Sequence, residues 1–277
     1  MKHRLVLNSL LGVNDLYVDM SKQMIIHYSK YPISEFVLTL NGNESQIRRF
    51  RDFLRGINVR MRIFPNTLVY DNRRQARWSN QRQAYIRDRY SEHDWKISVD
   101  SDEILLMNDV LYDTLDCTDS SYFLAFTVDM MPERSHVEVP CNTTVFEIPH
   151  RKCFLTQTNA LAQKAPLARN YILVEGAAHN VTKRFRREKR FEKILPLYHY
   201  KWESGVRERM LERFNRYKRL AIPYYNESRK FYDILQDGIN QLVVEDIYSV
   251  RFNIKRDKTG ECSLRIDPRG EYEFYKY

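Results

Sequence analysis

Residues 95–103 read Trp-Lys-Ile-Ser-Val-Asp-Ser-Asp-Glu, an alternating strand that runs directly into three carboxylates. Successive side chains of an extended chain point to opposite faces, so Asp100 and Asp102 share one face if the strand continues that far. Like charges this close raise each other's proton affinity unless a cation lies between them. Carboxylate oxygens at the carboxyl end of a parallel strand suit Mg²⁺ or Mn²⁺ held jointly with a substrate phosphate. The stretch predicts such a site, with a solvated acidic turn as the alternative.

The segments before residue 95 alternate between strand and helix patterns. Short apolar runs are bounded by turn residues, and the longer segments between them carry apolar residues at helical spacing. Strands are expected at residues 4–8, 35–40, 59–64 and 95–99, and helices at 21–31, 47–57 and 73–90. Strands and helices that alternate with short joints predict an α/β fold with a mostly parallel sheet flanked by helices.

The second half of the chain is less regular. Strands are expected at residues 122–128, 143–148, 171–174 and 194–200, a short helix at 108–115, and a longer helix capped by Ser204. The tail from Ser249 is expected to form a hairpin that turns at residues 257–260. No internal repeat and no linker rich in Pro, Gly or Ser divides the chain. We therefore expect a single domain with a C-terminal appendage of helix and hairpin.

The charge and composition limit the classes of partner. The chain has 277 residues and a formal net charge of +9, from 45 Lys and Arg against 36 Asp and Glu. This excess favours a polyanionic partner, which includes nucleic acid, anionic lipid and phosphorylated small molecules. The hydrophobic content excludes wholesale disorder, and no apolar stretch reaches the ~18–20 residues of a membrane span. Four scattered cysteines fit neither a zinc site nor a disulfide framework, so a reduced, cytoplasmic location is expected.

Together these motifs resemble the GT-A-fold glycosyltransferases, nearest to their family-2-like branch. That branch ends its nucleotide-binding half with a helix, a Trp-containing strand and an Asp-x-Asp-Glu motif, which correspond here to residues 73–90, Trp95 and residues 100–103. It also carries a Gly-x-His-like segment, matched one residue wider by residues 176–179, and a late His-Tyr motif, matched by His199-Tyr200. By the order of its elements, the resemblance covers the chain up to about residue 220.

The resemblance implies one catalytic domain and one activity. Residues 1–220 would form the GT-A-type, Rossmann-like domain, with a nucleotide-binding half at 1–103, an acceptor-binding half at 104–220 and the appendage at 221–277. The activity would be transfer of a sugar from a UDP- or GDP-linked nucleotide-sugar donor to a hydroxyl of a glycan, lipid-linked or protein acceptor. Mn²⁺ or Mg²⁺ would act as the Lewis acid on the leaving diphosphate.

The resemblance also gives particular residues a role in this reaction. Asp100 and Asp102 would bind the metal ion, with the neutral imidazole of His199 as a third ligand and a buried histidine as the alternative for His199. If the anomeric configuration inverts, a carboxylate must deprotonate the acceptor hydroxyl, and the candidates for that base are Asp129, Glu133 and Glu175. Contacts to the donor are expected from Asn8, Asn41, Arg77, Gln81, Arg82, Asp100, Ser101 and Lys183.

Basic residues flank the predicted site in the sequence. Arg82 matches an arginine that many family members place on the helix before the motif strand, and its fork of donors suits a pyrophosphate or a uracil edge. A solvated helix face is the alternative for this arginine and its neighbours. The run Lys183–Arg190 is either a loop that folds over the diphosphate, a surface for an anionic membrane, or a solvated run. His179 would meet the diphosphate or the acceptor, or is simply a core or loop histidine.

One segment departs from the family pattern. The first loop has Asn8-Ser9-Leu10 where an Asn-Glu pair is expected, which leaves the contacts to the base open.

Two other functions use some of the same features. A metal-dependent nucleotidyltransferase or other phosphoryl enzyme would use the same carboxylates, but it should have a Gly-rich phosphate loop or a lysine signature near the N-terminus. A basic nucleic-acid-binding module would explain the charge, although the aromatic residues fall at core-like spacings. Nucleic acid is therefore the less favoured partner.

Overall fold

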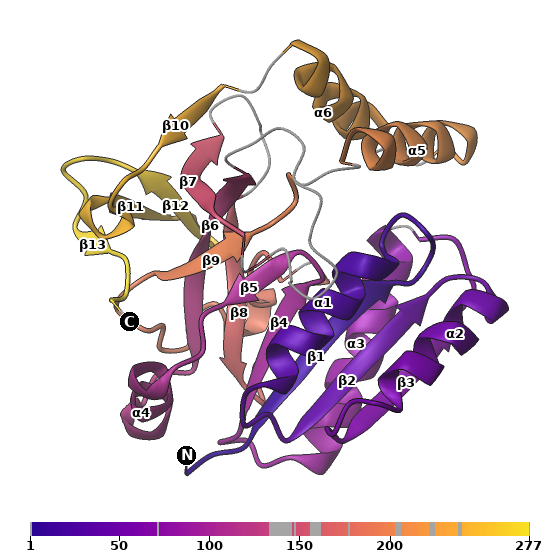
Figure 1. Cartoon of the computed structure of the whole chain (residues 1–277). Coiled ribbons are helices and arrows are strands. Elements are labelled where there is room, and N and C mark those ends of the chain that lie inside the picture. The colour runs from indigo at the N-terminus through magenta and orange to yellow at the C-terminus, as the bar shows by residue number, and fades with distance from the viewer. Residues whose placement is uncertain are drawn as a thin grey trace. The chain divides into compact units, whose positions relative to one another are not determined.

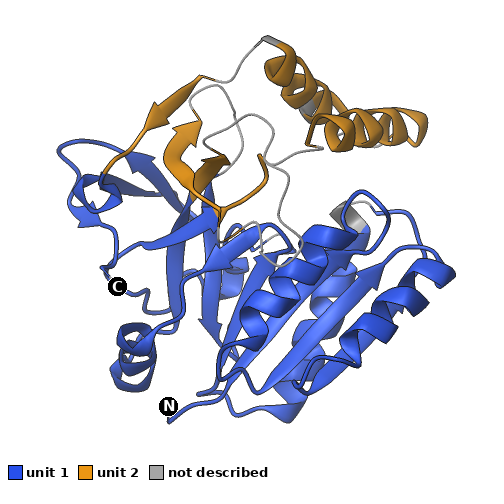
Figure 2. Cartoon of the chain, viewed as in Figure 1, with its two compact units in different colours: residues 1–127, 161–198, 246–277 blue, residues 128–160, 199–245 orange. Residues whose placement is uncertain are grey.

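The structure is a computed structural model, and it describes residues 2–70, 72–132, 146, 148–155, 162–176, 178–202, 206–221, 225–237 and 240–276. The chain divides into two compact units, which are coloured separately in Figure 2. Unit 1 comprises residues 1–127, 161–198 and 246–277, and unit 2 comprises residues 128–160 and 199–245. The boundaries expected at residues 103 and 220 stay predictions.

Four parallel strands form the centre of unit 1, in the order β3-β2-β1-β4. Their bounds are β1 Leu5–Gly12, β2 Glu35–Asn41, β3 Met61–Asn66 and β4 Trp95–Asp100. β1, β2 and β4 are buried along almost their whole length, which is typical of parallel strands covered on both faces. The chain moves outward from β1 to β3 and then returns to the other side of β1. The strand order therefore reverses between β1 and β4.

Three helices connect these strands. They are α1 Val18–Ser29, α2 Glu44–Leu54 and α3 Asn72–Arg89. Figure 1 shows α1 and α2 on one face of the parallel strands and α3 on the other, as right-handed crossovers require when the direction of strand addition reverses. α2 begins with a capping box, in which Asn43 and Gln46 each accept the main-chain N–H of the other at 2.9 Å. The helix expected at residues 21–31 begins earlier, at Val18, so Ser21, which the sequence suggests as its N-cap, instead lies inside α1, and its hydroxyl donates to the Gly12 carbonyl at 2.8 Å.

The sheet of unit 1 continues beyond β4 with antiparallel strands. β8 (Gln163–Arg169) pairs with β4, and the first half of β6 (Tyr122–Pro132) pairs with β8. β5 (Glu103–Leu105) pairs with β9 (Leu195–His199). The α/β class with a central parallel sheet flanked by helices is thus confirmed. The strand expected at residues 171–174 is wrong, because that segment is a turn followed by a single bridge residue and β8 precedes it.

The remaining elements of unit 1 are a short helix and the C-terminal sheet. α4 (Asp109–Cys117) begins after Asn108, whose side chain accepts the main-chain N–H of Leu111 at 3.0 Å. A 3-10 turn (Ile247–Ser249) leads into a three-stranded antiparallel sheet of β11 (Arg251–Arg256), β12 (Cys262–Ile266) and β13 (Tyr272–Glu273). The expected turn at residues 257–260 is confirmed, and Gly260 has a φ of 82°, which a residue with a side chain rarely adopts.

Unit 2 contains the second half of β6, which pairs antiparallel with β7 (His150–Leu155). β7 in turn pairs with β10 (Gln241–Val243). The helices α5 (Val206–Arg219) and α6 (Tyr225–Asp237) pack against each other, around a core of Trp202, Val206, Met210 and Phe231. Most of the strand expected at residues 143–148, and the cap expected at Ser204, lie outside the described residues. Within the described part of the chain, no helix has the length and apolar character needed to cross a membrane.

Candidate functional site

A pocket lies in unit 1 at the carboxyl ends of β1 and β4. It encloses about 270 Å³ of space not filled by protein atoms, part of it open to solvent. β1 and β4 are the strands between which the strand order reverses, and open α/β sheets bind their ligands at such a switch point. The polar side chains that line the pocket are Asn8, Ser79, Arg82, Ser98, Asp100 and Glu175.

Arg82 is the buried cation of this pocket. The residue is 3% exposed, its Nε donates to Asn8 Oδ1 at 2.6 Å, and its Nη1 donates to Thr39 Oγ1 at 2.7 Å. Both acceptors are neutral, and among the described residues no carboxylate forms an ion pair with Arg82. Burial lowers the pKa of Arg82 to about 10, although the charge of Asp100 acts in the opposite direction. Arg82 is therefore charged at neutral pH, and none of the described carboxylates forms an ion pair with it.

The position of Arg82 follows from the pattern of α3. Gln75, Ser79, Arg82, Ile86 and Tyr90 are buried and recur at intervals of three or four residues, which places them on one face of the helix. Polar residues thus occupy the buried face next to the pocket. Two other candidates on this helix, at positions 77 and 81, are exposed.

The loop at residues 174–178 closes one side of the pocket and is fixed to α3. The Gln83 side chain donates to the Val174 carbonyl and accepts the Val174 N–H, both at 2.9 Å. A Cβ added to Gly176 would lie 3.1 Å from the Cα of Ala76, so a glycine is needed for this close approach to the helix. Gly176, the glycine of the Gly-x-His-like segment, therefore forms part of the pocket wall.

A lysine holds the acidic turn that follows β4. Nζ of Lys164, on β8, lies 3.1 Å from Asp100 Oδ2 and 2.9 Å from Glu103 Oε1. The other oxygen of Glu103 accepts the main-chain N–H of Asp100 at 3.0 Å. Burial alone would lower the pKa of Lys164, but the charges of Asp100 and Glu103 outweigh it and raise the pKa. Lys164 thus supplies a cation between Asp100 and Glu103.

The carboxylates as they stand do not fit a divalent ion between Asp100 and Glu103. Lys164 uses one oxygen of each, and the main chain uses the second oxygen of Glu103. Within the part of the chain that the structure describes, no three His, Cys, Asp or Glu residues gather as a metal site. Ser101 and Asp102 lie in the same turn and are half-buried. Metal binding by Asp100 and Asp102 stays a prediction.

A second polar cluster lies in unit 2. Asp129 Oδ1 accepts hydrogen bonds from His199 Nδ1 at 3.0 Å and from Trp202 Nε1 at 2.7 Å. With Nδ1 as the donor, the neutral imidazole of His199 carries its lone pair on Nε2, the tautomer that a metal ligand or a general base needs. Both N–H donors thus meet the same carboxylate oxygen of Asp129. The structure brings this predicted base and this predicted ligand together, whereas Asp100 and Asp102 belong to unit 1.

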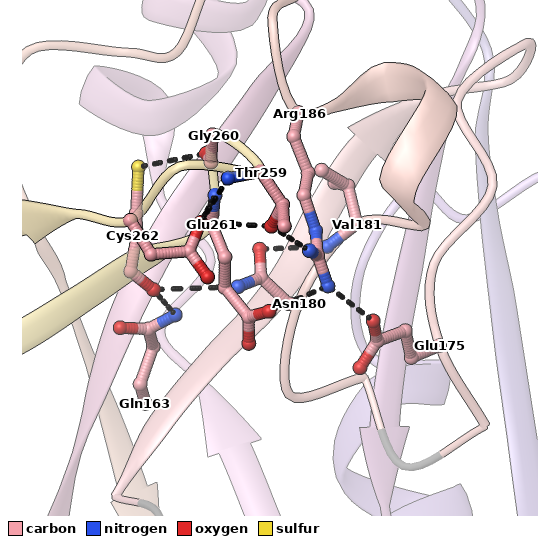
Figure 3. A network of polar contacts seen from close by, with 10 residues as sticks. Gln163, Glu175, Asn180, Val181, Arg186, Thr259, Gly260, Glu261 and Cys262 are labelled. Atoms are coloured by element: carbon pink, nitrogen blue, oxygen red, sulfur yellow. Dashed lines mark hydrogen bonds and ion pairs between the residues drawn. The ribbon is translucent and has the colours of Figure 1, made fainter.

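Glu175 and the basic run of residues 183–190 meet at the wall of the pocket (Figure 3). Arg186 Nη2 lies 3.2 Å from Glu175 Oε1 and 2.7 Å from Glu261 Oε2, and Arg186 Nη1 donates to Thr259 Oγ1 at 2.6 Å. Arg186 thus ties the pocket loop to the C-terminal hairpin, while Lys183 is exposed. The run is therefore not wholly solvated.

The other candidates have ordinary structural partners or lie outside the description. Asn41 donates to the carbonyls of Asn66 and Leu68 at 3.3 and 2.8 Å, which ties the end of β2 to the loop after β3. His179 Nδ1 lies 3.1 Å from the Gln163 carbonyl, which fits the reading of a loop histidine. Glu133 is not among the described residues.

Two polar residues of the pocket lining, Ser79 and Ser98, were not among the sequence candidates. Neither were Thr39 and Lys164, which contact the lining residues Arg82 and Asp100. Ser98 carries a usable signal, because it alternates with Asp100 on one face of β4. Its hydroxyl accepts a hydrogen bond from Asn8 Nδ2 at 2.9 Å. Thr39 and Lys164 give no comparable signal, since neither stands next to a motif.

Comparisons with known proteins give only distant structural matches. No known sequence family and no curated protein matches it. Among solved structures, HddC from Yersinia pseudotuberculosis has a TM-score of 0.39 and 9% identity, covering 77% of this chain and 100% of that chain. The 4-diphosphocytidyl-2C-methyl-D-erythritol synthase from Anaerococcus prevotii has a TM-score of 0.35 and 8% identity, covering 74% and 92%. The inositol-1-phosphate CTP transferase from T. maritima has a TM-score of 0.31 and 11% identity, covering 60% and 70%. Likeness at this level does not indicate what the chain binds.

Proposed function

We propose that the chain is a nucleotide-binding transferase that moves a sugar from a nucleoside-diphosphate donor to an acceptor hydroxyl. One observation carries the proposal: a buried arginine without a carboxylate partner lines a pocket at the switch point of an α/β sheet. A buried charge is costly unless it is paired, so this position favours an anionic ligand. Nucleotide phosphates at the carboxyl edge of the sheet meet that requirement.

The guanidinium of Arg82 is positioned for recognition rather than for packing. Asn8 and Thr39 hold its Nε and Nη1, and its Nη2 makes no hydrogen bond to any described residue. The two N–H groups of Nη2 are therefore free for a phosphate oxygen or for the edge of a base, both of which suit the planar fork of arginine. Charge that builds on a leaving diphosphate would be stabilised by this fixed donor.

The sugar-transfer part of the proposal is supported by the Asp100–Glu103 motif and its resemblance to the GT-A glycosyltransferases. A nucleotidyltransferase would use the same pocket for a nucleoside triphosphate, because in both reactions a diphosphate group leaves. The substrates and products distinguish glycosyl transfer from nucleotidyl transfer. A UDP- or GDP-sugar that releases a nucleoside diphosphate supports glycosyl transfer, whereas a triphosphate and a sugar phosphate that release pyrophosphate support nucleotidyl transfer.

The binding test uses thermal unfolding with UDP, GDP, CDP, CTP and a single-stranded oligonucleotide. We expect a nucleoside diphosphate to raise the Tm. In calorimetry, Arg82→Met should weaken its affinity by about 100-fold, because charge-assisted hydrogen bonds are lost. Arg77→Met is the matched control, since Arg77 lies on the same helix and is exposed. Stabilisation by the oligonucleotide alone, with a steep dependence on salt, would overturn the proposal.

A further inference from the structure

We propose that Lys164 is the resident cation of the acidic turn, and that the pocket therefore binds a nucleoside diphosphate without a divalent ion between Asp100 and Glu103. The proposal deepens the function proposed above and rests on it for the identity of the ligand. Its core is the position of one ammonium group, 3.1 Å from Asp100 Oδ2 and 2.9 Å from Glu103 Oε1.

The ammonium is held firmly by its surroundings. The side chain of Lys164 is 6% exposed and that of Glu103 is 3% exposed, so the pair is shielded from solvent and from screening by salt. Lys164 lies on β8, which pairs with β6 at this position and with β4 further along the strand. Breaking such a buried pair by removing one partner leaves an uncompensated charge, so the arrangement resists displacement.

The carboxylate oxygens are already used. Glu103 gives one oxygen to Lys164 and the other to the main-chain N–H of Asp100. Asp100 gives Oδ2 to Lys164, so Oδ1 is the only oxygen of the two carboxylates without a hydrogen bond to a described residue. A divalent ion that bridged Asp100 and Glu103 would have to displace the ammonium and the N–H.

Two basic side chains also oppose the charges of Asp100 and Glu103 without a metal ion. The charges of Asp100 and Glu103 are opposed by those of Lys164 and Arg82, and Arg82 interacts electrostatically with Asp100. A bound diphosphate would then be met by Arg82, whose charge is not taken up by an ion pair. A divalent ion between the carboxylates would instead place two further positive charges beside a buried ammonium, which like-charge repulsion opposes.

The first experiment measures the affinity of the wild-type protein for a nucleoside diphosphate by calorimetry, in excess MgCl₂ and in EDTA. We expect the two affinities to agree within about threefold, because the cation between the carboxylates is part of the chain. A loss of more than about tenfold in EDTA that Glu103→Gln abolishes would overturn the proposal, because it would mean that Glu103 binds the divalent ion.

The second experiment asks whether removing the ammonium creates a metal site. Lys164→Gln leaves Asp100 and Glu103 without a cation, and we expect it to bind Mn²⁺ at least about tenfold more tightly than the wild type in a titration followed by electron paramagnetic resonance. Lys164→Arg keeps the charge and should not gain Mn²⁺ affinity, and Lys258→Gln, on the exposed hairpin turn, is the matched control. Equal Mn²⁺ affinity in the Gln variant and the wild type would contradict the inference.

The two experiments separate this inference from the proposed function. If no nucleotide binds, the proposed function fails, and the Mn²⁺ titration still decides the role of Lys164. If circular dichroism shows that Lys164→Gln does not fold, the comparison of MgCl₂ with EDTA on the wild-type protein and on Glu103→Gln decides it.

Discussion

β4 has a buried positive charge near each of its ends, and the protein satisfies the two charges differently. Near the amino end, Lys96 is fully buried, and its ammonium donates to the main-chain carbonyls of Arg169 at 3.3 Å, of Asn170 at 2.9 Å and of Ile172. Beside the carboxyl end, Arg82 donates to one side chain on β1 and one on β2, and its Nη2 makes no hydrogen bond to a described residue. Neither cation forms an ion pair within the described residues.

The difference shows what marks a binding site in this protein. A buried charge alone does not mark a binding site. The ammonium of Lys96 donates to main-chain carbonyls at the end of β8 and in the turn after it, and so fixes that turn. The amino end is reinforced by Arg169, whose guanidinium lies 3.9 Å from the centre of the Trp95 ring. At the carboxyl end, donors remain unused and a pocket is open in front of them. Changes at the amino end should therefore alter stability, and changes at the carboxyl end should alter ligand binding.

The largest expected effect is on stability, from Trp95→Ala at the amino end. Trp95 is fully buried, packs against Phe123 with ring centres 5.5 Å apart, and donates from Nε1 to the Leu115 carbonyl at 3.1 Å. Its truncation leaves a cavity and an unpaired carbonyl, so we expect the free energy of unfolding to fall by about 4 kcal/mol in urea denaturation. The nucleotide affinity of the folded fraction should stay unchanged. A variant that kept its stability but lost nucleotide would contradict the division between the two ends.

The next effect is a pH dependence that belongs to Lys96. Burial, with a smaller contribution from Arg87, lowers the pKa of Lys96 from 10.5 to about 7. Between these values the unfolded chain binds more protons than the folded chain, so the contribution of Lys96 to stability rises with pH. From pH 7 to pH 9 we expect the wild type to gain about 2 kcal/mol of unfolding free energy relative to Lys96→Met.

Urea denaturation of both proteins across that pH range measures this difference. Lys258→Met, with an exposed lysine, should show no such change relative to the wild type. A constant difference between wild type and Lys96→Met across the range would mean that the three carbonyls hold Lys96 protonated. Lys96 would then keep a permanent positive charge in the core, as Arg82 does, and the two ends of β4 would not differ in charge.

The parallel half of the sheet could be predicted from sequence because each of its strands carries its own signal. β1 and β2 are nearly continuous apolar runs, and a capping box or a turn residue follows each of them within a few positions. β8 could not be predicted, because it reads Gln-Lys-Ala-Pro-Leu-Ala-Arg and has a proline in its middle. Its conformation depends on β4 and β6 on its two sides, and the register with β6 shifts between Phe123 and Ala125. Pairing over such distances leaves no local pattern.

The residues of the candidate site also divide into those that the sequence indicates and those that it does not. Arg82 and Asp100 could be named from sequence, because Asp100 belongs to the motif and Arg82 lies on the helix before it, and Asn8 was named from the first loop of the family pattern. Lys164 could not be named, since it is 64 residues from Asp100 in the chain and sits on the strand that the sequence conceals. The contact of Lys164 with the acidic turn was thus missed together with the strand that carries it, and metal binding by Asp100 and Asp102 stays a prediction.

A smaller effect at the carboxyl end tests whether the neutrality of Asn8 matters. Asn8→Asp keeps the shape of the side chain but places a carboxylate 2.6 Å from Arg82 Nε. The new ion pair would use the charge that the ligand needs, so we expect nucleotide affinity to fall by about tenfold in calorimetry, with stability retained. Asn80→Asp serves as the control, because Asn80 is on the same helix as Arg82 and is exposed. Unchanged affinity in Asn8→Asp would mean that the ligand does not meet Arg82.

The smallest effect is expected from Glu175→Gln at the wall of the pocket. The side chain of Glu175 is 41% exposed, and Arg186 keeps its second partner, Glu261, at 2.7 Å. A partly exposed ion pair contributes little, so the free energy of unfolding should change by less than about 0.5 kcal/mol and nucleotide affinity by less than twofold. Glu261→Gln, which removes the other carboxylate, should behave alike in both measurements.

If turnover with an acceptor fell by about 100-fold in Glu175→Gln alone, with affinity intact, Glu175 would be the general base rather than a surface partner of Arg186. The carboxyl end of the sheet would then supply both the charge that binds the donor and the group that activates the acceptor.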